Sequence, residues 1–207
     1  MSTERFFEKK KRNTETRKQK PVILIVAEGE NVTESQYFKS FQRQNPTCNI
    51  RLALAKHVTD PEGMLKAIQI RWKELGLDAR KGDKAYVVLD LDCDRDKARL
   101  IRKIQKDSKE TQFIISNPCF EVWFLLHFRY STKQYLSGDA VIKDLKTFIP
   151  EYKKELDISS QLDSSRKTAI ENAEKLRQYF DELGYEWPSI ECNPMTDVDI
   201  VVKKINT

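Results

Sequence analysis

The chain has 207 residues, of which 39% are hydrophobic and 33% are charged, and its formal net charge is +5. This length suits one domain with a sizeable core. No apolar run approaches the roughly 18 residues of a membrane span, and the charged N-terminus lacks the apolar segment of a secretory signal. We therefore expect no membrane partner. The four cysteines are scattered and lack zinc-site spacing, which favours free thiols in a cytoplasmic protein.

Residues 1–20 are expected to form a flexible basic tail. This segment contains eight Lys/Arg and three Glu residues, so the net charge of the whole chain resides here. The cluster Lys9, Lys10, Lys11 and Arg12 is a candidate for binding nucleic-acid phosphates. The alternative is a solubilising leader with no ligand.

Strands and helices are predicted to alternate between residues 21 and 130. Short apolar runs predict strands at 22–26, 50–55, 86–89 and 113–115, and the runs at 22–26 and 86–89 are rich in β-branched residues. Helix signals separate these runs: a capping box from Thr33 to Gln36, a cap at Asp60 before Pro61, apolar spacing at 98–104, and a cap at Asn117. The order predicts an α/β core with a mainly parallel sheet flanked by helices.

From residue 131 to residue 207 the pattern becomes helical. Helices are predicted at 139–149 and 164–183, and Thr196 is a candidate cap for a last helix that ends near Ile205. We expect this segment to pack on the 21–130 core as a helical extension of one domain.

Carboxylates follow two of the predicted strands. Glu28 ends the first strand, and alternating aspartates at 90, 92, 94 and 96 follow the third. Carboxyl ends of parallel strands meet at one edge of a sheet, and strand spacing would turn Asp90 and Asp92 to the same side. Clustered oxygen ligands select Mg²⁺ or Mn²⁺. The predicted metal ligands are therefore Glu28, Asp90, Asp92 and Asp94, although Asp94 is equally compatible with a role outside the site.

Other readings of the aspartates fit less well. An EF-hand loop that starts at Asp90 would need Gly at position 95 and Glu at position 101, where Arg and Ile stand. A phosphatase of the haloacid dehalogenase type would need Thr or Val at position 94. The chain also lacks a Walker-type phosphate-binding loop.

The segment from Asn117 to His127 carries further candidates. Asn117 and Pro118 are expected to start a helix that is rich in large apolar residues. Glu121 lies one turn in and is a site candidate if it is buried, or a solvent-facing, dipole-stabilised residue if it is not. His127 fits an acid–base role and a core position equally well.

These motifs together resemble the RloB-like family, whose members look like Toprim-type proteins. The matching segments are Ile-Leu-Ile-Val-Ala-Glu-Gly-Glu at 23–30, Asp-Leu-Asp at 90–92, Ser-Asn-Pro-Cys-Phe-Glu-Val-Trp at 116–123, and Asn-Pro-Met-Thr-Asp at 193–197. The resemblance implies a Toprim-like fold with Glu28 as general acid/base and Asp90 and Asp92 as Mg²⁺ ligands. It adds Glu34 and Glu121 as supporting acidic residues.

The resemblance also implies a place in bacterial anti-phage defence beside an ATPase of the RloA-like, AAA or ABC kind. The function expected is a Mg²⁺-dependent endonuclease that acts on nucleic acid, with Glu28 and Glu121 as catalytic residues and Asn117 and His127 in support. The alternative is a non-catalytic regulatory subunit of the ATPase complex. The choice between DNA and RNA, and between homo- and hetero-oligomers, stays open.

Overall fold

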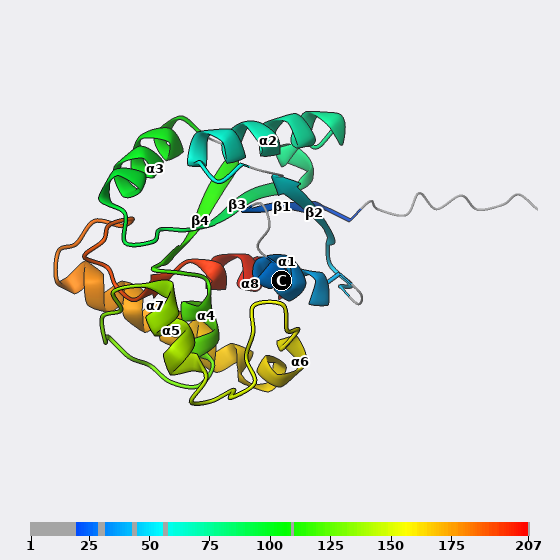
Figure 1. Cartoon of the computed structure of the whole chain (residues 1–207). Helices are drawn as coiled ribbons and strands as arrows, with labels where there is room; N and C mark the ends of the chain where they lie inside the picture. Colours follow the sequence, from blue (N-terminus) through cyan, green and yellow to red (C-terminus); the bar gives the residue numbers. More distant parts are fainter. Residues whose placement is uncertain (1–19, 29–31, 43–44, 56–57, 109, 207) are drawn as a thin grey trace, which may run out of the picture.

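A five-stranded sheet organises the part of the chain that this computed structural model describes, which is residues 20–28, 32–42, 45–55, 58–108 and 110–206. The strand order is β2-β1-β3-β4-β5 (Figure 1). The strands are β1 (Val22–Glu28), β2 (Asn49–Ala55), β3 (Lys84–Asp90), β4 (Thr111–Asn117) and β5 (Met195–Thr196). β1 to β4 are parallel, and β5 is antiparallel to β4. The predicted α/β class with a mainly parallel sheet is therefore confirmed.

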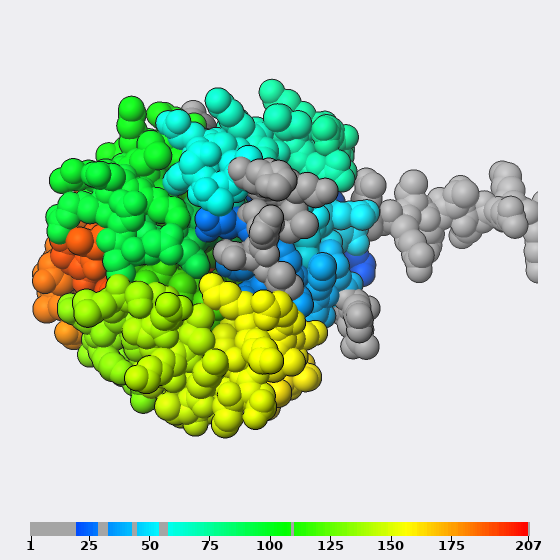
Figure 2. All heavy atoms as spheres, viewed as in Figure 1, coloured from blue at the N-terminus to red at the C-terminus, as the bar shows by residue number. Residues whose placement is uncertain are grey.

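Helices cover both faces of the sheet (Figure 1). On one face lie α2 (Pro61–Glu74) and α3 (Arg95–Asp107), with the 3₁₀ turn η1 (Ala79–Lys81) before β3. The other face carries α1 (Val32–Ser40), α4 (Glu121–Leu126), α5 (Gly138–Leu145), α6 (Ser159–Leu162), the 3₁₀ turn η2 (Asp163–Ser165), α7 (Arg166–Glu182) and α8 (Val198–Asn206). Figure 2 shows α2 and α3 on one side of the molecule and residues 130–165 on the opposite side.

Each face of the sheet has its own apolar core, because successive strand residues point to opposite sides. Leu24, Val87 and Leu89 pack with Ile68 of α2 and Ile101 of α3. On the opposite face, a larger core joins sheet residues with α1, α4, α5, α7 and α8. The C-terminal helices thus share one apolar core with the sheet.

Several helix signals in the sequence are confirmed. The Asp60 side chain accepts a hydrogen bond of 2.8 Å from the Gly63 backbone N–H and caps α2. The Thr196 hydroxyl accepts a bond of 3.3 Å from the Val198 N–H at the start of α8. The four cysteines are free, as their spacing predicted.

The prediction of a capping box from Thr33 to Gln36 is wrong. α1 begins at Val32, so Thr33 lies inside the helix. Its hydroxyl donates a hydrogen bond of 3.0 Å to the Lys154 carbonyl, and the Gln36 amide donates one of 2.9 Å to the Glu155 carbonyl. Both side chains therefore hold a distant loop against α1 instead of satisfying the helix end.

Strand β5 was not predicted, because two residues are too few for a periodic signal. The basic tail lies almost wholly outside the described residues, so the prediction for Lys9, Lys10, Lys11 and Arg12 is not tested by the structure. Among the described residues, no helix has both the length and the apolar character needed to cross a membrane.

Candidate functional site: a buried acidic cluster

Glu28 and Asp90 end neighbouring parallel strands. β1 and β3 pair with Ala27 opposite Val88, so both carboxylates lie at the carboxyl edge of the sheet. Asp90 is only 7% exposed, and Glu28 is half-buried. Burial raises the pKa of Glu28, and the charge of Asp92 raises it further. The predicted convergence of these residues at one sheet edge is therefore correct.

The turn after β3 places Asp92 differently from the prediction. The strand ends at Asp90, and Asp92 and Cys93 adopt left-handed backbone angles with φ of 55° and 56°. The turn is held by a hydrogen bond of 2.9 Å from the Asp92 N–H to the Pro118 carbonyl. Strand spacing therefore does not apply beyond Asp90. The Asp92 side chain is 62% exposed and forms an ion pair of 3.0 Å with Lys97.

Asp94 caps the N-terminus of α3. Its Oδ1 atom accepts hydrogen bonds of 2.8 Å from the Asp96 N–H and 3.0 Å from the Lys97 N–H, which caps α3. The geometry thus favours a cap over the predicted metal ligand. Asp96 lies in the first turn of α3, as expected.

Two helices bring further carboxylates to the same place. Glu34, in the first turn of α1, is 2% exposed, and Glu121, the first residue of α4, is 1% exposed. The solvent-facing alternative for Glu121 is therefore wrong. Burial raises the pKa of Glu34 to about 7, with a further contribution from the charge of Glu121. Burial also raises the pKa of Asp90 well above its usual value, and the charges of Glu34 and Glu121 add to it.

Asn117 does not cap a helix. It is fully buried, and its Oδ1 atom accepts a hydrogen bond of 3.2 Å from the Cys93 N–H. Its Nδ2 donates a bond of 2.9 Å to the Cys192 carbonyl. α4 begins only at Glu121, after Phe120 in the cap position. Asn117 therefore supports the site by tying the turn after β3 to the C-terminal segment.

His127 belongs to the core. Its Nδ1 atom lies 2.9 Å from the Trp123 carbonyl, and its ring packs edge-on against the Trp123 indole. Burial lowers the pKa of His127 to about 4, so the ring is neutral at physiological pH. The core interpretation is therefore the correct one.

Three residues at the site escaped the sequence analysis. Tyr152 donates a hydrogen bond of 2.9 Å to Glu121, and Lys97 pairs with Asp92. Partial burial lowers the pKa of Lys154, but the charges of Glu121 and Asp90 outweigh this and raise it overall. Tyr152 and Lys154 lie in an irregular loop with no motif, so only their fold-dependent position reveals them.

The cluster has the chemistry of a site for a hard cation. The Asp90 Oδ1 atom is buried and finds no hydrogen-bond partner among the described residues. A buried oxygen without a partner is costly, and a divalent cation would both satisfy it and relieve repulsion between the carboxylates. In the described part of the chain, however, no three His, Cys, Asp or Glu side chains converge closely enough to hold a metal ion. The carboxylate oxygens are the kind of ligand that a divalent cation prefers, but a bound cation would have to draw the carboxylates closer together.

A second set of buried carboxylates is structural. Asp199 is fully buried and pairs with Arg177 at 2.8 Å and Lys203 at 2.7 Å. Asp197 accepts a hydrogen bond of 2.7 Å from the Trp187 indole N–H. These contacts satisfy both carboxylates. The Asn-Pro-Met-Thr-Asp segment at 193–197 and the helix after it therefore contribute these carboxylates to packing.

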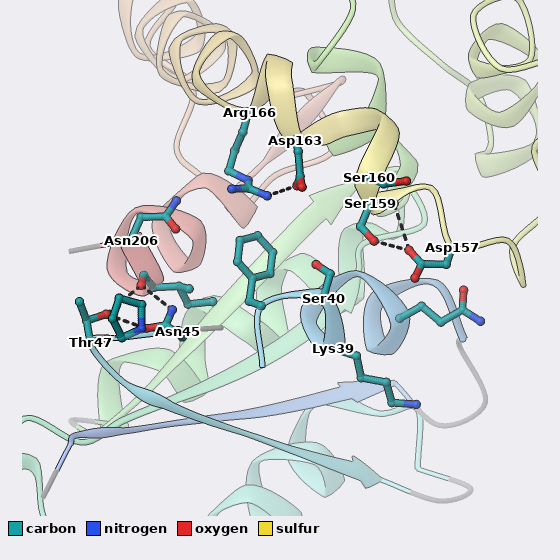
Figure 3. Close-up of a pocket in the computed structure, with 14 residues that line it drawn as sticks. Lys39, Ser40, Asn45, Thr47, Asp157, Ser159, Ser160, Asp163, Arg166 and Asn206 are labelled. Carbon is teal, nitrogen blue, oxygen red and sulfur yellow. Dashed lines mark hydrogen bonds and ion pairs between the residues drawn. The ribbon is translucent and has the colours of Figure 1, made fainter. Parts of the chain in front are cut away.

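A pocket in the described part of the chain lies away from the acidic cluster (Figure 3). It has a volume of about 680 Å³ between α1, the end of α8 and the start of α7. The Arg166 guanidinium stacks 4.6 Å from the centre of the Phe41 ring, and it forms an ion pair with Asp163. None of the acidic residues at the sheet edge lines it. Its cationic and anionic side chains balance, so the lining indicates no ligand class.

The fold and the site define an α/β protein with a buried acidic cluster at the carboxyl edge of a mainly parallel sheet. The family model described as RloB-like protein matches residues 23–205. The chain therefore belongs to the RloB-like family, as the motifs indicated. Neither the curated proteins nor the solved structures gave a match.

Proposed function

We propose that this RloB-like protein is a Mg²⁺- or Mn²⁺-dependent endonuclease with a Toprim-like site, working in bacterial defence beside an ATPase. The observation that carries the proposal is the buried Asp90 carboxylate, whose Oδ1 atom has no hydrogen-bond partner among the described residues. Asp90, Asp92 and Glu28 would hold the cation, with Glu34 and Glu121 in support. A bound cation of this kind polarises a phosphoryl oxygen and stabilises charge on the attacking and leaving oxygens.

The chain's own residues supply the remaining chemistry. Glu28 is half-buried with a raised pKa, which suits a carboxylate that accepts a proton from an attacking water molecule. Lys154 is exposed beside the cluster and keeps its charge, so it can bind a substrate phosphate. Tyr152 fixes Glu121 through its hydroxyl. Asn117 holds the turn that carries Asp92.

A regulatory subunit of the ATPase is the second candidate. It is favoured by the lack of an assembled ligand set among the described carboxylates and by the ion pair that already engages Asp92. Such a protein would bind the ATPase and change its turnover without cutting nucleic acid.

A cleavage assay separates these functions. The full chain is incubated with plasmid DNA, single-stranded DNA and total RNA in Mg²⁺, Mn²⁺ or EDTA, both by itself and with the ATPase of its locus. Asp90→Asn removes one charge at nearly constant shape, and Glu171→Gln removes one from an exposed site on α7.

Metal-dependent cleavage that Asp90→Asn abolishes and Glu171→Gln retains supports the nuclease. No cleavage in any condition, with an altered ATPase rate on addition of the chain, supports the regulatory subunit.

A further inference from the structure

The solvent-facing side of α3 concentrates positive charge. The helix has six Lys/Arg residues against two aspartates, although residues 21–207 as a whole are electrically balanced. Five of the six recur at helical spacing and define what we call the basic face of α3: Arg95, Arg99, Arg102, Lys103 and Lys106. Ala98 and Ile101 of the same helix are buried against the sheet.

The basic face lines two hollows that share three residues, and we refer to the two hollows together as the groove. Arg99, Arg102, Lys103 and Lys106 line a hollow of about 460 Å³ with Asp107 and Glu186. A second hollow of about 410 Å³ shares Arg102, Lys106 and Glu186 and extends to Trp187 and Arg177. In Figure 2, α3 lies at the surface beside the orange C-terminal segment that forms the other wall.

Much of this positive charge is available to a ligand. Lys103 and Lys106 are exposed and form no ion pair with the described residues. Arg99 pairs with Asp96 at 3.3 Å, but both side chains are mostly exposed, and such surface pairs are weak. Arg95 pairs with Glu191 at 2.9 Å at the edge of the face.

The N-terminal end of α3 lies beside the acidic cluster, and the two hollows lie further along the helix. α3 starts directly after the turn that carries Asp92, and Lys97 in its first turn pairs with that aspartate. Thirteen helical residues span about 20 Å, which corresponds to about six phosphates of one strand at about 3.4 Å each. A strand lying along the basic face would therefore reach the N-terminal end of α3, which follows the turn that carries Asp92.

We propose that the basic face of α3 binds the sugar-phosphate backbone of the substrate and delivers the strand to the acidic cluster. This inference rests on the proposed function for its ligand class. Lysine and arginine along an open groove bind phosphates without reading sequence. The face is separate from the tail cluster at residues 9–12.

The test is a binding titration by fluorescence anisotropy with labelled 20-nucleotide single-stranded DNA, single-stranded RNA and duplex DNA. All proteins are full-length and carry Asp90→Asn, which prevents cleavage. The α3 variant combines Arg99→Gln, Lys103→Gln and Lys106→Gln. The matched control combines Lys143→Gln, Lys146→Gln and Lys175→Gln, which removes three exposed charges from α5, its end and α7. A third protein neutralises Lys9, Lys10, Lys11 and Arg12.

The α3 variant should bind about ten-fold or more weakly at 100 mM salt, and its slope of log K against log salt should be smaller by about 2 to 3. The control should bind like the parent, and circular dichroism should show all variants folded. Equal affinity and slope in the α3 variant and the control would overturn the inference, as would a chain that binds no nucleic acid. If the α3 variant binds nucleic acid normally and loses only its binding to the ATPase, the basic face binds an acidic protein surface. That result would also overturn the inference.

Cleavage, measured in proteins that retain Asp90, distinguishes this inference from the proposed function. Binding through α3 without cleavage would reject the nuclease and leave the inference standing. Cleavage that the α3 substitutions do not slow would reject the inference alone.

Discussion

Tyr152 donates a hydrogen bond of 2.9 Å to the Oε1 atom of Glu121. The two residues come from an irregular loop and from the first turn of α4, and both are almost completely buried. The same loop accepts hydrogen bonds from Thr33 and Gln36 of α1. One loop therefore closes the acidic cluster from the side of the C-terminal helices.

Replacing Tyr152 with Phe should destabilise the protein by about 1–3 kcal/mol, because a buried carboxylate oxygen would lose its donor. The free energy of unfolding from urea titration measures this loss. Tyr179→Phe is the matched control, since Tyr179 is 37% exposed on α7. Equal stability of the two variants would show that the Glu121 carboxylate does not depend on this hydroxyl.

Stability should depend on pH through Glu34. Its pKa is about 7 in the folded protein against an ordinary 4.5, so the folded state binds this proton more tightly. The stabilisation is complete below pH 4.5 and is lost as pH rises through about 7. The whole difference amounts to about 3 kcal/mol.

The check is Glu34→Gln, which cannot ionise. Its free energy of unfolding, relative to the wild type, should rise by about 3 kcal/mol between pH 4.5 and pH 8 in EDTA. A difference for Glu34→Gln that stays constant over this pH range would mean that Glu34 ionises normally in the folded protein.

Asp94→Ala tests the cap at α3. The substitution should cost about 1 kcal/mol of stability, because two backbone N–H groups lose their acceptor. Asp60→Ala removes the equivalent cap of α2 and should cost a similar amount. Both variants should keep the Mn²⁺ affinity of the wild type in a calorimetric titration. A selective loss of affinity in Asp94→Ala would restore Asp94 as a ligand.

Features encoded by local periodicity were predictable from the sequence. The run of β-branched residues before Glu28, the Asp60-Pro61 helix start and the Thr196 cap all depend on neighbouring residues alone. Placement of Glu28 and Asp90 at one edge followed from the parallel sheet, since this topology brings strand ends together.

Features decided by tertiary contacts were not predictable. The residues next to Asn117 suggest a helix cap. Its side-chain amide instead forms hydrogen bonds with the backbone of Cys93 and Cys192, which are far away in the sequence. The strand-spacing argument for Asp92 failed because the chain turns after Asp90 with positive φ angles. Lys154 belongs to no motif, and only folding brings it to the carboxylates.

The central claim is that the acidic cluster binds a divalent cation, and a Mn²⁺ titration by calorimetry at pH 7.5 tests it most directly. The wild type and Glu171→Gln should show saturable binding, and Asp90→Asn should lose at least ten-fold in affinity, which corresponds to about 1.4 kcal/mol. Equal heats of binding in Asp90→Asn and the wild type, or no binding by either, would contradict the account.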